Sequence, residues 1–173
     1  MRRRDVIPYL TDGLIRSIPF LTCFGFLFLG LFPFRLAFFA ELFVPFIFIA
    51  LFCWLILRPD LLPPMTVFIL GVLADLMYVY PLGVDTLIFM LFYVLVYTQR
   101  RFLVGHSFLF LWGTFAVFML PLIGFQWGLV SLLRWQLMPI GAAVGQYCLL
   151  IGFYPLIAGL CSKLYNMYLD DMA

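Results

Sequence analysis

The chain has 173 residues, of which 66% are hydrophobic and only 10% are charged, and its mean hydropathy is +1.17. Soluble domains are about 45–50% apolar and about 25% charged, so this composition excludes an ordinary soluble domain. The formal net charge is only +2, and no nucleic-acid partner is expected. The sequence therefore predicts a polytopic integral membrane protein.

Apolar runs that approach the ~20 residues needed to cross a bilayer predict six transmembrane helices in a single domain that covers residues 1–173. In chain order the expected spans are residues 17–31, 42–57, 65–80, 85–99, 108–127 and 140–160. The connections are short, so the fold class is all-α, a six-helix membrane bundle. With the N-terminus inside, eight of the ten Lys and Arg residues lie on the inner side. The positive-inside rule thus predicts that both termini are cytoplasmic.

Asp75 lies in the middle of the third expected span, where an ionisable residue is rare and expensive. Gly71, Asp75 and Tyr78 are spaced i, i+4 and i+7, so they share one helix face, and Gly71 would let another backbone approach closely. One interpretation is a site for a proton, an ion or a ligand. The other, which we favour, is a buried hydrogen bond that fixes helix packing.

The turn after this helix contains Pro81 and Gly83 and leads into the fourth span at Asp85. Gly83 can adopt the positive φ that a tight reversal often needs. Asp85 and Thr86 are expected to cap the N-terminus of the next helix. We interpret this segment mainly as turn chemistry, with contact to a partner as a secondary role.

A depth calculation predicts a layer of polar side chains inside the bundle. Asp75 precedes Pro81 by six residues, which places it about 9 Å below the turn at 1.5 Å per residue. Tyr93 and Gln146 are expected at the same level if the third, fourth and sixth helices are neighbours. In that layer we expect Asp75→Asn to be tolerated and Asp75→Leu to weaken the helix arrangement.

Two further features concern contacts with other molecules. Glycines at four-residue spacing, Gly124 with Gly128 and Gly141 with Gly145, mark faces where helices touch, either within the bundle or on a partner's helix. The two turns expected at the cytoplasmic face carry Arg58, Asp60, Arg100 and Arg101. These residues are interpreted as orientation signals that contact membrane lipids, with docking of a cytoplasmic partner as the alternative.

No catalytic constellation, phosphate-binding glycine loop or metal cluster is visible in the sequence, so we expect a protein that is not an enzyme and has no cofactor. Two functions remain open. A membrane scaffold fits the short loops and the glycine pattern. A small-solute-binding or transport subunit would need a polar cavity.

The central segment resembles the MreD family of bacterial rod shape-determining membrane proteins, in particular its alphaproteobacterial branch. The resemblance rests on Trp54 followed by the Arg58-Pro59-Asp60 turn and its Pro63-Pro64 pair, on Gly71 with Asp75, on Pro81-Leu82-Gly83, and on Gln99-Arg100-Arg101. It implies a non-enzymatic component of the cell-elongation machinery in the inner membrane. Its implied partners are the single-span protein MreC, the actin-like MreB, and the peptidoglycan synthase formed by RodA and its penicillin-binding transpeptidase. The implied fold is similar to the substrate-binding subunits of energy-coupling-factor transporters.

Overall fold

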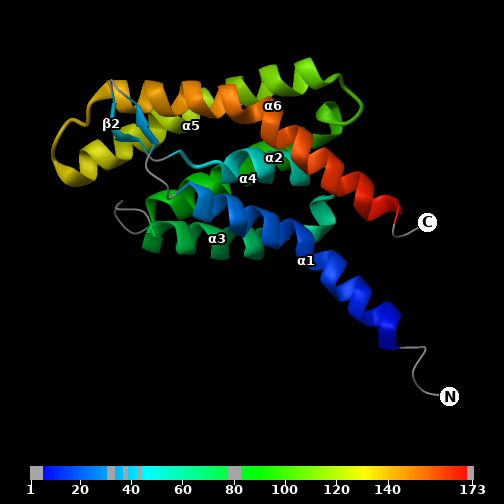
Figure 1. The fold of residues 1–173 in the computed structure, drawn as a ribbon. Coiled ribbons are helices and arrows are strands. Elements are labelled where there is room, and N and C mark those ends of the chain that lie inside the picture. The colour runs from blue at the N-terminus through cyan, green and yellow to red at the C-terminus, as the bar shows by residue number, and fades with distance from the viewer. Residues whose placement is uncertain (1–5, 31–33, 37–38, 43, 78–82, 171–173) are drawn as a thin grey trace.

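Within the described residues the chain forms a bundle of six α-helices, shown in Figure 1. The computed structural model describes residues 6–30, 34–36, 39–42, 44–77 and 83–170. The helices are α1 (Val6–Leu29), α2 (Ile47–Leu57), α3 (Pro64–Met77), α4 (Val84–Leu103), α5 (Phe108–Arg134) and α6 (Ile140–Asp170). A 3-10 turn, η1 (Pro59–Leu61), joins α2 to α3. The predicted all-α bundle is therefore confirmed.

A short β-ribbon between α1 and α2 is an addition to the all-α prediction. Strand β1 (Phe34–Leu36) pairs antiparallel with β2 (Phe39–Leu42). The second span was expected to begin at residue 42, but α2 begins only at Ile47. Phenylalanine and leucine satisfy both a membrane helix and a strand, so hydropathy could not separate the two here.

Three described helices are long and apolar enough to cross a membrane, namely the ranges Val84–Leu103, Phe108–Arg134 and Ile140–Tyr165. The apolar segments Ser17–Leu29, Ile47–Leu57 and Pro64–Met77 are shorter. Helices α5 and α6 run beyond the expected spans, to Arg134 and Asp170. Hydropathy marks the apolar part of a helix, whereas backbone hydrogen bonding continues into its polar ends.

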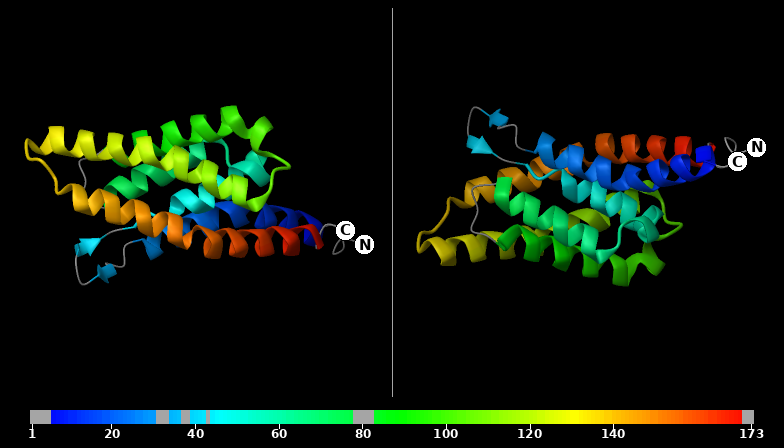
Figure 2. Two further views of the ribbon diagram at one scale, coloured as in Figure 1. Left: turned by 90° about the horizontal axis from the view of Figure 1, so that it is seen from above. Right: turned by 90° about the horizontal axis from the view of Figure 1, so that it is seen from below.

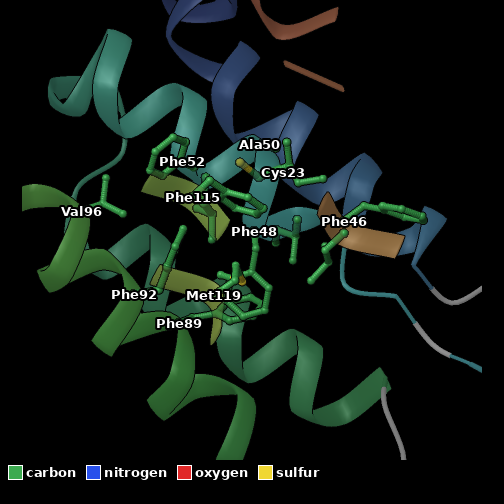
Figure 3. Close-up of a cluster of buried hydrophobic side chains, with 14 of the residues drawn as sticks. Cys23, Phe46, Phe48, Ala50, Phe52, Phe89, Phe92, Val96, Phe115 and Met119 are labelled. Carbon is green, nitrogen blue, oxygen red and sulfur yellow. The ribbon is translucent and has the colours of Figure 1, made fainter. Parts of the chain in front are cut away.

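Helix α2 lies at the centre of the bundle and packs against α1, α4 and α6. Nine of its eleven residues are buried, as expected for a helix that is apolar all round. Its phenyl rings form edge-to-face pairs with α4 and α5: Phe48 with Phe89 and Phe92, and Phe52 with Phe115. Figure 3 shows these rings converging from three helices. The core is therefore an aromatic cluster around a short central helix.

Local sequence explains where α2 ends and α3 and α4 begin. Arg58 precedes Pro59, and a residue before proline is disfavoured in the α conformation. Pro64 starts α3 in the first turn, where a missing N–H is harmless. Gly83 precedes α4 with φ 97°, a value that suits glycine.

Figure 2 shows that α1 begins and α6 ends at the same end of the bundle, opposite the turn between α5 and α6.

Candidate functional site

The carboxylate of Asp75 holds the first turn of the next helix. Its Oδ1 accepts a hydrogen bond from the backbone N–H of Asp85 at 2.8 Å, and its Oδ2 accepts one from the N–H of Thr86 at 3.2 Å. The Thr86 hydroxyl donates a further, short bond to the same Oδ2. These two N–H groups have no partner inside α4, because the first turn of a helix lacks acceptors. Asp75 is thus an N-terminal cap supplied by a different helix.

The position of this cap is favourable for a negative charge. Asp75 is 4% exposed, and a carboxylate at a helix N-terminus interacts well with the partial positive charge of the peptide dipoles. Asp85 and Thr86 were expected to cap α4 with their own side chains, but the N-cap residue is Gly83, and the side chains of Asp85 and Thr86 bond Gln126 and Asp75 instead. The sequence therefore identified the capped turn and assigned the acceptor to the wrong helix.

The close approach expected at Gly71 is present. A Cβ atom added to Gly71 would lie 2.7 Å from the Cα of Thr86, a separation that real Cβ atoms essentially never show. Gly71 is buried one helical turn before Asp75, so both residues face the start of α4. The absence of a side chain at Gly71 allows α3 and α4 to come close enough for the Asp75 bonds to form.

A second carboxylate extends the cluster to a third helix. Asp85 is 3% exposed, and its Oδ1 accepts a bond of 2.7 Å from Nε2 of Gln126 in α5. Its Oδ2 is buried and has no hydrogen-bond partner among the described residues. No Lys or Arg of the described chain is bonded to either carboxylate. We call Asp75, Asp85, Thr86 and Gln126 the polar cluster.

Gln126 was not among the predicted site residues, because the predicted polar layer drew only on the third, fourth and sixth helices and Gln126 lies in α5. It is a single amide in a long apolar run, and it is 5% exposed. A buried amide must find hydrogen-bond partners, so an isolated Gln in a membrane helix is itself a signal of an interhelical contact. That signal would have marked α5 as a helix that bonds to a neighbour, without naming the partner.

The predicted layer of Asp75, Tyr93 and Gln146 does not form as expected. The hydrogen bonds of Asp75 go to Asp85 and Thr86, while the half-buried Tyr93 ring stacks on Tyr97 with centroids 5.6 Å apart. Axial rise predicts depth but not the direction in which a side chain points around the helix. Gln146 is 8% exposed and lines a cavity together with Gln126. It is therefore close to the polar cluster without bonding Asp75.

The remaining candidates lie in different surroundings. Gly141 is exposed and Gly145 is buried in α6, whereas Tyr78 and Pro81 lie outside the described residues. On α5 and α6, a Cβ added at Gly124, Gly128, Gly152 or Gly159 would meet nothing within 4 Å. These four glycines therefore make no close helix contact with the described residues of the bundle.

The two basic turns are brought together at the other end of α4. Nε of Arg100 donates a hydrogen bond of 3.1 Å to the backbone oxygen of Ile56, in the last turn of α2. Arg58 follows that turn, and its backbone N–H bonds the oxygen of Trp54 at 2.8 Å. Asp60 and Arg101 are exposed. Arg100 thus satisfies a helix C-terminus, while Asp60 and Arg101 remain available to lipid or to a partner.

The described residues contain no group of three or more His, Cys, Asp or Glu that could hold a metal ion. The hydrogen bonds of the polar cluster instead hold the start of α4 against α3 and α5. Cys23 and Cys161 are buried, and Cys53 and Cys148 are partly or fully exposed, all as free thiols.

The chain matches a known protein family. The sequence model of the family described as rod shape-determining protein MreD matches residues 14–164, which is most of the chain. No curated protein and no solved structure matches the chain. The matched region contains all six helices at least in part, together with the whole polar cluster and the Arg100 contact. The chain therefore belongs to the MreD family of shape-determining membrane proteins, and its role lies in the determination of rod shape.

Proposed function

We infer that this protein is a non-enzymatic membrane scaffold of the cell-elongation machinery, which links MreC, MreB and the peptidoglycan synthase of RodA and its transpeptidase. The observation that carries the proposal is that a Cβ added at any of four glycines of α5 and α6 would meet nothing within 4 Å, namely Gly124, Gly128, Gly152 and Gly159. We call the surface of the two helices at these four positions the open glycine face. Small residues in a membrane helix are useful where another backbone approaches, and here the bundle itself leaves that space empty. A single-span partner such as MreC has a helix that could occupy it.

The finer features of the proposal rest on the charge pattern and the family resemblance. We place the protein in the bacterial inner membrane, with six spans and both termini in the cytoplasm. The excess of Lys and Arg on that side supports this orientation. The central sequence supports membership of the alphaproteobacterial branch and a fold like that of energy-coupling-factor substrate-binding subunits. A cysteine introduced at Gly83 should then react with an impermeant reagent from the periplasm.

The scaffold proposal is tested by filling the open glycine face. Gly124→Leu and Gly152→Leu should each reduce co-purification of MreC with the full-length protein by about tenfold, because leucine keeps two backbones apart. Gly25→Leu on α1 is the matched control, since a side chain at Gly25 also meets nothing within 4 Å. Cell width should increase in the two test strains and stay normal in the control.

Membrane levels of all three variants must be compared by immunoblot. Unchanged MreC recovery in both test variants, or an equal loss in Gly25→Leu, would contradict the use of this face. The first outcome would move the search for the partner surface to the exposed Asp60 and Arg101.

A further inference from the structure

A cavity of about 130 Å³ lies between α5 and α6, next to the polar cluster. The turn that covers it is tied to α5 by two hydrogen bonds. Nε1 of Trp127 donates to the Met138 oxygen at 3.0 Å, and the Met138 N–H donates to Ser131 Oγ at 3.3 Å. An apolar cavity of ~150 Å³ holds one benzene molecule, so this space suits a group of a few heavy atoms.

The lining of the cavity is mostly apolar, and two amide side chains supply most of its hydrogen-bonding groups. Gln126 and Gln146 both line it, and both side chains are more than nine-tenths buried. The bond from Gln126 Nε2 to Asp85 fixes the orientation of that amide, which leaves its oxygen on the side away from Asp85. The indole N–H of Trp127 is already used by Met138. A ligand that donates hydrogen bonds would therefore match this lining.

The carboxylate next to the lining also favours a ligand of this kind, provided that the ligand is positively charged. Asp85 is bonded to the lining residue Gln126 but does not itself line the cavity. One of its oxygens is buried without a partner among the described residues, and the bonds of Asp75 are directed to α4. An unpaired carboxylate in a low-dielectric interior strongly favours a nearby positive charge. The Trp127 ring, which also lines the cavity, can attract a cation through its face.

We propose that this cavity binds a primary ammonium group. Such a group has N–H donors for the oxygens of Gln126 and Gln146, fits the volume, and supplies the positive charge that Asp85 lacks. The ammonium can belong to a phospholipid headgroup or to a free small amine. The site is independent of the open glycine face, so its failure would leave the scaffold proposal untouched.

The first experimental arm tests the lipid source. The full-length protein is placed in nanodiscs with equal amounts of phosphatidylethanolamine, phosphatidylcholine and phosphatidylglycerol, and retained lipids are counted by native mass spectrometry. Phosphatidylethanolamine should be retained at least about tenfold over the others, the effect of one hydrogen bond to a charged group. Gln146→Leu removes an acceptor and Ala143→Leu fills the cavity, and both should abolish the preference. Gln99→Leu, an exposed amide on α4, should not.

The second arm tests a free amine. Ethanolamine should raise the melting temperature of the wild-type protein and of Gln99→Leu but not of Gln146→Leu, because a ligand stabilises the state that binds it. Ethylene glycol is the neutral control of the same size. A lipid preference identifies the headgroup source, and ethanolamine stabilisation alone identifies the free amine. The absence of both in the folded wild-type protein, or their persistence in Gln146→Leu and Ala143→Leu, would overturn the proposal.

Discussion

The two ends of α4 are fastened in opposite ways. At the first turn, the Asp75 carboxylate of α3 accepts three hydrogen bonds while almost fully buried. At the last turn, Arg100 of α4 itself reaches out and donates one bond to α2 from a half-buried position. Charge that is enclosed by protein is screened little, whereas charge near water is screened strongly. The hydrogen bonds of Asp75 at the first turn of α4 should therefore contribute much to stability, and the single hydrogen bond of Arg100 at the last turn should contribute little.

The largest effect is expected from Asp75→Leu. It leaves two backbone N–H groups and one hydroxyl without an acceptor, so the free energy of unfolding should fall by about 3 kcal/mol or more, at ~1–3 kcal/mol for each of the three groups. The stability of Asp75→Asn should lie between those of the wild type and Asp75→Leu, because one amide oxygen replaces two carboxylate oxygens. The amide NH₂ group would also face the N–H of Thr86, and two donors cannot bond each other. This geometry revises the expectation that Asn is tolerated. Thermal unfolding in detergent measures the stability of the two Asp75 variants, with Asp60→Leu, a change at an exposed carboxylate, as the control.

Gly71→Ala tests whether the hydrogen bonds of Asp75 require the close approach of α3 and α4. The new methyl group would meet the backbone of Thr86, so α3 and α4 must separate, at a cost of about 1–3 kcal/mol. Gly25→Ala has open space and should change the melting temperature little. If Gly71→Ala and Gly25→Ala have the same melting temperature, the close contact at Gly71 does not govern the stability of the α3–α4 pair.

Gln126→Leu tests the third helix of the polar cluster. Both oxygens of Asp85 would then lack partners, and the expected destabilisation is about 1–3 kcal/mol. The double variant Asp85→Leu with Gln126→Leu should recover part of that loss, because removing both partners leaves no buried polar group unsatisfied. A double-mutant cycle on purified protein measures the coupling, and strictly additive losses would show that the two side chains act independently.

The smallest effect is expected at the other end. Arg100→Met keeps much of the side-chain length and loses the bond to Ile56, which should cost about 0.5–1.5 kcal/mol. Arg101→Met, one residue further along and exposed, is the matched control. A loss of stability in Arg100→Met as large as that in Asp75→Leu would contradict the ranking of the two ends.

Sequence reasoning located this arrangement better than it explained it. Asp75 and Gly71 stood out because a carboxylate and a small residue share one face of an apolar helix, and the structure shows both facing α4. The partners Tyr93 and Gln146 were chosen by depth from the fourth and sixth helices, so Gln126 of α5 was left out although α5 packs against α4. Rotation about each helix axis is decided by packing with distant segments, which one sequence does not display.

The buried position of α2 has a consequence for the order in which the protein is assembled. The contacts between α3 and α4 join residues only ten or eleven apart, so this hairpin can close as soon as both helices are in the bilayer. Helix α2 is made earlier, yet one of its sides is covered by α6, which is made last among the described helices. The centre of the bundle is therefore completed by the two halves of the chain together, and a nascent chain that stops before residue 140 would leave α2 facing lipid instead of its final neighbour.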